Sequence, residues 1–171
     1  MTSKFNAIIE QGIDVPLKVT DKILYLGASH GITPKILAEK VKKGFVFCVE
    51  ISPVVMRTLL NVCQQNENMA PLLYDASKIE PNKIPKVDFI YQDLAQKNQV
   101  EILIKNIKKF LKPNGRFILI IKSRSIDAIK KKELIIKEAI TKLKDYSILH
   151  IINLQKTHKD HFAIIGKNIK K

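Results

Sequence analysis

The segment from residue 22 to residue 34 limits most strongly what this chain can fold into. An apolar run, Lys22 to Leu26, ends in the small-residue loop Gly27-Ala28-Ser29-His30-Gly31, and Thr33-Pro34 then starts a helix. This order is typical of the first strand, loop and helix of an α/β fold, in which a nucleotide-like ligand binds at the loop and the helix N-terminus. Ligand binding is therefore the first function to consider.

Strand-like and helix-like segments alternate along the rest of the chain. The predicted strands are residues 22–26, 45–49, 70–73, 87–91, 116–121, 146–152 and 161–166. Helices are predicted over residues 5–11, 98–111 and 131–143 and from the starts Thr33-Pro34 and Ser52-Pro53, the latter with a buried stripe of Val54, Val55, Met56, Leu59, Leu60 and Val62. Apolar runs that alternate with helices indicate a mainly parallel sheet, and two adjacent strands at the C-terminus allow one antiparallel edge strand.

Length and composition favour one intracellular domain with an anionic partner. The 171 residues fit a single domain, with residues 1–20 as an N-terminal helix and lead-in. No signal-type or membrane-length apolar segment is present, and Cys48 and Cys63 form no CxxC pair, so a reducing cytosol is expected. The net charge of +14 favours nucleic acid, although a lysine-rich chain also arises from genome composition or a hot habitat.

The loop spacing is GxxxG, whereas dinucleotide-binding proteins use GxGxxG, so a nicotinamide enzyme is the weakest option. A short loop of small residues suits a methionine-type carboxylate and an adenosine. Glu50 ends the second predicted strand, where an acid commonly accepts hydrogen bonds from ribose hydroxyls, but it can equally cap the next helix. Asp75 follows the third strand and suits either an adenine amino group or a turn.

Polar side chains also follow the later strands. Asp93 and Gln96 come after the fourth strand, and Lys122 ends the fifth. Because the carboxyl ends of parallel strands meet at one edge of the sheet, these residues should converge there, as a site or as a plain ion pair. His158 and His161 with Asp160 lack the further ligands that a metal site needs, so no metal site is predicted. His161 instead stands at a strand end, where its imidazole should lie near this crevice.

Four motifs in this order resemble fibrillarin, especially its archaeal form. They are Lys22 to Ser29; Tyr91 to Gln96 with Gln99 and Ile102 to Asn106; Ile121 to Asp127; and Lys159 to His161. The resemblance spans almost the whole chain. It implies a Rossmann-like S-adenosylmethionine-dependent methyltransferase fold, and transfer of a methyl group from S-adenosylmethionine to ribose 2′-hydroxyls of rRNA and tRNA, directed by a box C/D guide RNA.

The resemblance also implies partners and residue roles. A Nop-family scaffold protein and, indirectly, a kink-turn-binding protein would position the enzyme on guide and substrate RNA, in the cytoplasm for an archaeal-type protein or the nucleolus for a eukaryotic one. The implied cofactor-binding residues are Gly27, Ala28, Ser29, Gly31, Thr33, Glu50, Ile51, Asp75, Ala76, Asp93 and Gln96. The implied catalytic group is Lys22, Asp93, Lys122 and His161, with Lys122 beside the hydroxyl and Asp93 orienting it. Arg124 and Lys130 flank the crevice and are the expected RNA contacts.

The chain also departs from the family pattern. The family usually has Gly-Thr-Thr where this chain has Gly31-Ile32-Thr33, so Ile32 replaces one of two threonines. Tyr74 stands where the family has glycine or an acid. No counterpart of the family's N-terminal β-rich domain or glycine-arginine-rich tail is present in these 171 residues. Two alternatives stay open: a methyltransferase that acts without a guide RNA, and a catalytically weak structural subunit of a ribonucleoprotein.

Overall fold

The computed structural model describes residues 2–169. Its strands are β1 (Lys22–Leu26), β2 (Phe45–Glu50), β3 (Met69–Leu73), β4 (Val87–Gln92), β5 (Leu111–Lys122), β6 (Ser147–Asn153) and β7 (His161–Lys167). Its helices are α1 (Lys4–Ile9), α2 (Ile32–Lys40), α3 (Pro53–Gln64), α4 (Gln99–Phe110), α5 (Ser123–Ile126) and α6 (Lys132–Lys142). None of the helices in this range is both long and apolar enough to span a bilayer.

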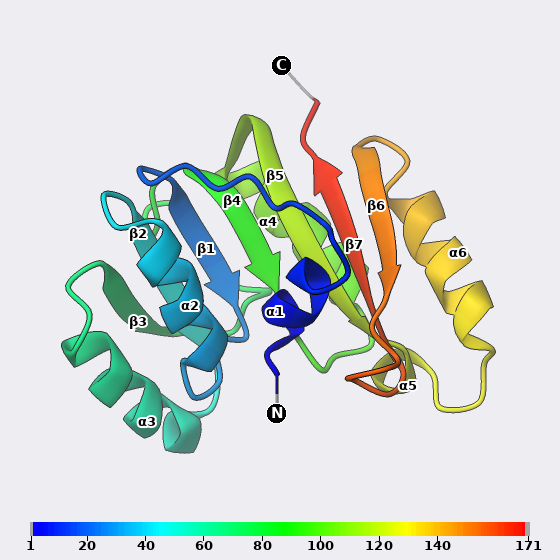
Figure 1. Cartoon of the computed structure of the whole chain (residues 1–171), viewed down its shortest axis with the longest axis horizontal. Coiled ribbons are helices and arrows are strands. Elements are labelled where there is room, and N and C mark those ends of the chain that lie inside the picture. The colour runs from blue at the N-terminus through cyan, green and yellow to red at the C-terminus, as the bar shows by residue number, and fades with distance from the viewer. Residues whose placement is uncertain (1, 170–171) are drawn as a thin grey trace.

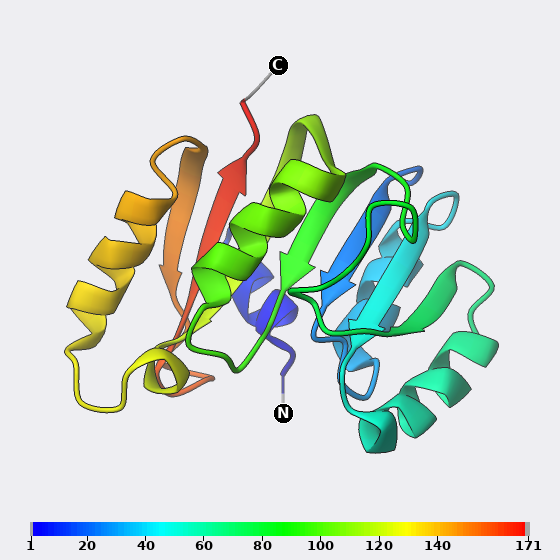
Figure 2. The ribbon, with the colours of Figure 1, turned by 180° about the vertical axis from the view of Figure 1, so that it is seen from behind.

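The strands form one sheet in the order β3-β2-β1-β4-β5-β7-β6 (Figure 1). Strands β3, β2, β1, β4 and β5 pair in parallel, and β7 runs antiparallel between β5 and β6. The predicted α/β fold, with antiparallel pairing at one side of a mainly parallel sheet, is confirmed. As expected for parallel strands linked by helices, the ends of β1, β2 and β4 lie at one edge of the sheet (Figure 1 and Figure 2).

Each face of the sheet is covered by its own hydrophobic core. One core contains Phe5 of α1, Leu37 of α2 and Leu59 of α3, packed on side chains of β1, β2 and β4. The other core lies under α4 and α6 and contains Leu103 and Ile135 (Figure 2). Burial on both faces explains why the strands are continuous apolar runs in the sequence.

The local predictions differ from the structure in several places, and strand β5 begins at Leu111, five residues before its predicted start. Helix α2 begins at Ile32 after a left-handed Gly31, one residue before the predicted start at Thr33, so Thr33 lies inside the helix and does not cap it. Helix α3 begins at Pro53 after the N-cap Ser52, where the pair Ser52-Pro53 predicted its start. Val54 and Leu60 of the predicted buried stripe are 76% and 42% exposed, because the helix covers the sheet margin with a narrow face of Met56, Leu59 and Cys63. The short helix α5 was not predicted, since four residues carry no periodic signal.

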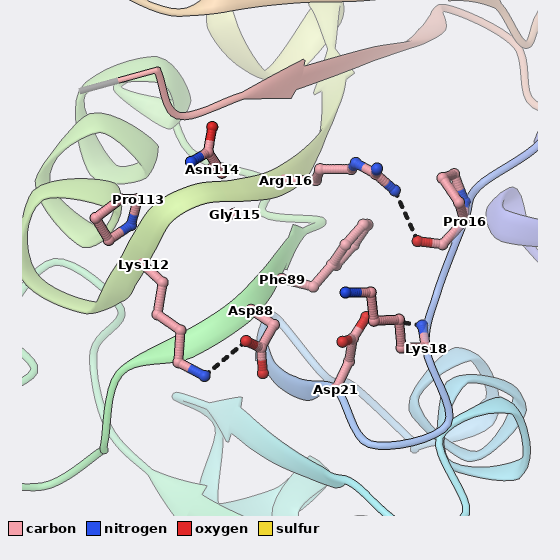
Figure 3. A pocket seen from close by; sticks show the side chains of 10 residues that line it. All are labelled: Pro16, Lys18, Asp21, Asp88, Phe89, Lys112, Pro113, Asn114, Gly115 and Arg116. Carbon is pink, nitrogen blue, oxygen red and sulfur yellow. Dashed lines mark hydrogen bonds and ion pairs between the residues drawn. The ribbon is translucent and has the colours of Figure 1, made fainter. Parts of the chain in front are cut away.

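A cleft of about 210 Å³ lies at the opposite edge of the sheet, where β1 and β4 begin (Figure 3). The charged groups of Asp21, Asp88, Lys112 and Arg116 bond to one another or to the backbone. The Lys112 ammonium is 2.6 Å from the Asp88 carboxylate, and the Arg116 guanidinium donates to the carbonyl of Pro16 at 2.8 Å. These bonds tie the lead-in segment to the sheet, so we regard this cleft as a structural junction.

The contact between Gly166 and Phe117 gives a test of the packing. A Cβ on Gly166 would lie 2.3 Å from the ring of Phe117, which is fully buried. We expect Gly166→Ala to lower the free energy of unfolding by about 1–3 kcal/mol, measured by denaturant unfolding. Gly12→Ala is the comparison for backbone strain without a clash, because its φ is +79° while a Cβ there meets nothing within 4 Å. Adding Phe117→Leu to Gly166→Ala should recover part of the loss, and strict additivity of the two changes would contradict a steric origin.

Candidate active site

Two lysines from distant parts of the chain hold the carboxylate of Asp93. Asp93 follows β4, and its backbone N–H donates to the carbonyl of Leu26 at 2.9 Å, which places it beside the end of β1. One carboxylate oxygen is 2.8 Å from Nζ of Lys4, and the other is 2.8 Å from Nζ of Lys122. All three side chains are largely buried, with exposed fractions between 13% and 21%. We call Lys4, Asp93 and Lys122 the ionic triad.

The triad keeps Asp93 ionised. Burial, the largest single influence, acts to raise the pKa of Asp93, but the combined charge and hydrogen bonds of Lys122 and Lys4 outweigh it and leave the pKa below its ordinary value. With two ammonium groups and one carboxylate, the triad carries a net positive charge. Such a group can stabilise a developing alkoxide beside it.

Lys4 takes the place that the sequence analysis assigned to Lys22. Helix α1 buries Phe5 completely, with its ring centroid 6.3 Å from that of Tyr91 in β4, and this packing brings Lys4 over Asp93. Lys22 stands at the beginning of β1, where its backbone N–H donates to Asp88. A strand of five residues separates its two ends by roughly 13 Å, so the grouping of Lys22 with Asp93 was wrong. A lysine in the first turn of a short helix gives no sequence signal of this role.

Two histidines lie beside the ionic triad. His161 begins β7 and pairs in register with Lys122 at the end of β5, and its Nδ1 donates to the carbonyl of Lys159 at 2.6 Å. Burial is the main cause that lowers the pKa of His161, and it also lowers the pKa of His158, whose ring centroid is 6.0 Å away. Both rings are therefore neutral at pH 7. With its Nδ1 proton held by Lys159, His161 keeps Nε2 as an acceptor.

Two cavities meet at the ionic triad. The first, of about 290 Å³, is lined by Gly27, Ser29, Val49, Glu50, Ile51, Tyr74, Ala76, Asp93, Leu94, Ala95, Gln96 and Lys122. The second, of about 350 Å³, is lined by Thr2, Ser3, Lys4, Tyr25, Gly27, Ala28, Ser29, His30, Ile32, Thr33, Asp93, Lys122 and His158. Gly27, Ser29, Asp93 and Lys122 line both. Of the predicted cofactor-binding residues, Gly31 and Asp75 line neither cavity.

The glycine loop brings the backbone close to the triad. Gly27 has a φ of +83°, and a Cβ there would lie 2.5 Å from the carbonyl oxygen of Asp93, so only glycine fits. The Glu50 carboxylate, 9% exposed, accepts hydrogen bonds from the backbone N–H groups of Ser29, Ile51 and Ser52 at 2.9 Å each. Glu50 therefore organises both the loop and the start of α3, and its predicted ribose contact stays a prediction.

Asp75 stabilises a turn, which is one of the two roles that the sequence analysis allowed for it. One oxygen accepts from the backbone N–H and the hydroxyl of Ser77, at 2.8 and 2.7 Å, and these bonds are the main cause that lowers the pKa of Asp75. The turn places Ala76 in the wall of the first cavity, and Asn106 holds the carbonyl of Ala76 at 2.9 Å. The adenine contact of Asp75 stays a prediction.

Arg124 and Lys130 are both paired with acids of this chain. The Arg124 guanidinium is 3.6 Å from Asp160 and also donates to the carbonyl of Ala128 at 2.7 Å. The Lys130 ammonium is 2.6 Å from Glu138. An RNA phosphate would have to compete with these exposed pairs, which are individually weak. Among residues 2–169 no group of three or more His, Cys, Asp or Glu side chains is placed to hold a metal ion.

Comparison with known proteins agrees with this geometry. A family model described as Fibrillarin matches residues 1–170. The chain belongs to the fibrillarin family. It is 44% identical over 169 residues to a fibrillarin-like rRNA/tRNA 2′-O-methyltransferase of Methanocaldococcus jannaschii, covering 96% of this chain and 74% of that protein. The corresponding protein of Archaeoglobus fulgidus is 40% identical over 167 residues, covering 95% of this chain and 79% of its own length.

Solved structures support the same assignment. A fibrillarin/Nop5p complex contains a chain that superposes with a TM-score of 0.94 at 38% identity, covering 97% of this chain and 81% of that one. Aeropyrum pernix fibrillarin with natively bound S-adenosyl-L-methionine gives a TM-score of 0.84 at 33% identity, covering 95% and 74%. The resemblance inferred from the four motifs is confirmed, and so is the methyltransferase fold.

The triad makes a testable prediction for Asp93. Because Lys4 and Lys122 hold the pKa of Asp93 down, Lys4→Met and Lys122→Met should each raise it, as measured by carboxyl-carbon NMR titration. Lys22→Met is the matched control and should leave the Asp93 titration unchanged.

The same shift has a consequence for stability. A carboxyl whose folded pKa is depressed contributes stability above its unfolded pKa of about 3.9, and that contribution is lost as the pH falls through the folded value. The loss should be smaller in Lys122→Met, and an identical acid-unfolding curve would contradict the assigned ion pairs.

Proposed function

We propose that this chain transfers a methyl group from S-adenosylmethionine to ribose 2′-hydroxyls of rRNA and tRNA, directed by a box C/D guide RNA. The observation that carries the proposal is the ionic triad at the junction of two adjoining cavities, in a chain of the fibrillarin family. The relatives from M. jannaschii and A. fulgidus are named as fibrillarin-like rRNA/tRNA 2′-O-methyltransferases.

The first cavity fits the methyl donor. Its wall lacks a side chain at Gly27, where the backbone must come close, and it presents the Glu50 carboxylate and the small residue Ala76. Gly27 and Ser29 would face the methionine end, Glu50 and Ile51 the ribose, Ala76 and the Asp75 turn the adenine, and Gln96 the sulfonium. The predicted cofactor contacts Ala28 and Thr33 line only the second cavity, so they would be reached from that side. When bound there, S-adenosylmethionine supplies an electrophilic methyl group.

The second cavity fits the acceptor ribose. A hydroxyl placed between Lys4 and Lys122 would meet two ammonium groups, which stabilise the negative charge that grows on its oxygen. Asp93 holds both ammonium groups in place, and neutral His161 next to Lys122 tunes their charge. Holding the oxygen in line with the methyl carbon can itself supply several kcal/mol, so positioning is the larger part of the catalysis.

The proposed assembly includes a Nop-family scaffold protein, in line with the fibrillarin/Nop5p complex that this chain resembles. A kink-turn-binding protein would take part indirectly, and guide and substrate RNA would approach the edge of the sheet that carries the triad. The chain spans 74% of the length of the M. jannaschii relative. A cytoplasmic location, with roles in rRNA and tRNA processing, stays a prediction.

Lys4 and Lys122 should be essential for methyl transfer. In a complex reconstituted with matched guide RNA and partner proteins, Lys122→Ala and Lys4→Ala should lower kcat by about 100-fold or more, because each removes one charge at the alkoxide. Lys22→Ala is the matched control and should keep wild-type activity. The measurement is transfer of a labelled methyl group to the guided nucleotide.

Other outcomes of the same experiment decide between functions. No transfer by the wild-type chain, together with no binding of S-adenosylmethionine in calorimetry, would make it a structural subunit of a ribonucleoprotein. Transfer that survives removal of the guide RNA would make it a stand-alone methyltransferase.

Arg124 and Lys130 should contribute to RNA binding. Their neutralisation, as Arg124→Gln with Lys130→Gln, should reduce the slope of log affinity against log salt by about one unit for each lost phosphate contact. Lys42→Gln with Lys43→Gln, at the opposite edge of the sheet, is the control. If Arg124→Gln with Lys130→Gln leaves the slope of log affinity against log salt unchanged, RNA does not contact these two residues.

A further inference from the structure

Strand β5 continues past the end of its parallel neighbour. The last registered pair between β4 and β5 is Gln92 with Leu119, whereas β5 runs on to Lys122. On its other side Lys122 still pairs with His161 of β7. The backbone of Lys122 therefore has no strand partner on the side that β4 leaves uncovered, although the neighbouring residues Ile121 and Ser123 are fully buried.

The side chain of Gln99 occupies that place. Its Oε1 accepts a hydrogen bond from the backbone N–H of Lys122 at 3.2 Å, and its Nε2 donates to the carbonyl of Lys122 at 3.4 Å. The side-chain amide thus offers one acceptor and one donor, as the backbone of a neighbouring strand would. Gln99 is the first residue of α4 and is fully buried, so no water competes for these bonds.

Gln99 is itself fixed to the end of β4. The side chain of Gln92 donates from Nε2 to the backbone carbonyl of Gln99 at 2.6 Å, and Gln92 directly precedes Asp93. On the other side of β5, the backbone N–H and the hydroxyl of Ser123 donate to the carbonyl of Asp160 at 3.1 and 2.9 Å. These bonds hold the backbone of Lys122 from both sides. Through Gln99 and Gln92 they also link it to the end of β4, the strand that directly precedes Asp93.

This placement matters because the Lys122 side chain is long and flexible. Its ammonium lies 2.8 Å from the Asp93 carboxylate and 3.4 Å from the Asp93 carbonyl. A displacement of the backbone by about 1 Å is enough to change reaction rates strongly when a group must meet a reacting atom. An apolar residue at position 99 would fill the same volume but would not fix the position of the Lys122 backbone. It would also leave the N–H and carbonyl of Lys122 without a hydrogen-bond partner on this side.

We propose that Gln99 is a positioning residue, whose side-chain amide completes the β-ladder at Lys122 and so holds the Lys122 ammonium against Asp93 and the acceptor oxygen. The kinetic part of this inference rests on the proposed function. The geometric part concerns only Lys122 and Asp93.

The test uses a variant that keeps the volume of Gln99 and loses both bonds. Gln99→Met in the reconstituted complex should lower kcat about tenfold while the KM for S-adenosylmethionine stays within about twofold, because the cofactor cavity is not lined by Gln99. Gln99→Glu keeps an acceptor for the N–H but loses the donor, so its kcat should lie between the two. It also serves as the second variant if Gln99→Met does not fold.

Asn168→Leu is the matched control for stability. Asn168 is 7% exposed, and its side-chain amide donates to the backbone carbonyl of Lys112 at 3.2 Å, at the edge of the sheet opposite the triad. We expect this variant and Gln99→Met to lower Tm by similar amounts, but only Gln99→Met to lower kcat. Equal kcat values in the two variants would overturn the proposal.

A measurement without substrate separates this inference from the proposed function. If the Lys122 ammonium is displaced in Gln99→Met, the NMR titration of Asp93 should move to higher pH, while Asn168→Leu leaves it unchanged. An unchanged Asp93 titration in Gln99→Met would overturn the positioning role. A shifted titration in a chain whose wild type transfers no methyl group would retain the positioning role and reject the proposed function.

Discussion

The buried charge of Asp93 is the constraint around which this molecule is arranged. A carboxylate that is largely removed from water is costly unless charged or hydrogen-bonded partners compensate it, and here two ammonium groups do so at 2.8 Å each. The partners come from distant parts of the chain. The N-terminal helix must pack on the sheet to bring Lys4, and β5 must extend beyond β4 to bring Lys122.

The parallel sheet supplies the geometry that makes this arrangement possible. Strands β1, β2 and β4 end at one edge, so Gly27, Glu50 and Asp93 meet there although long helical connections separate them in sequence. Backbone groups complete the frame: Glu50 holds three N–H groups, and the missing side chain of Gly27 lets the loop touch the carbonyl of Asp93. The antiparallel strand β7 adds His161 beside Lys122. Buried amides such as Gln99 then hold the ends of strands where the ladder stops.

The sequence analysis succeeded where the signal is local or follows from the direction of a strand. All seven strands were predicted. Strands such as β1, β4 and β7 are buried on both faces and stand out from amphipathic helices, whereas β3 and β6 are partly exposed and were predicted from short apolar runs alone. Asp93 and Lys122 were predicted to converge because each follows or ends a parallel strand. The assignment of Lys22 to the catalytic group was wrong for the same physical reason. Lys22 begins its strand and therefore lies at the opposite edge of the sheet from Asp93. The motifs that resemble fibrillarin gave the family, which the whole-chain comparison confirms.

The sequence by itself determined the alternation of elements, the glycine loop and the residues at the strand ends, because side-chain periodicity and backbone restrictions act over a few residues. Only the tertiary structure decided which lysine shares Asp93 with Lys122. That choice depends on the packing of Phe5 against Tyr91, a contact between residues far apart in the chain. It likewise decided that Gln99 replaces a strand at Lys122, since the lengths of β4 and β5 differ only once the strands are paired.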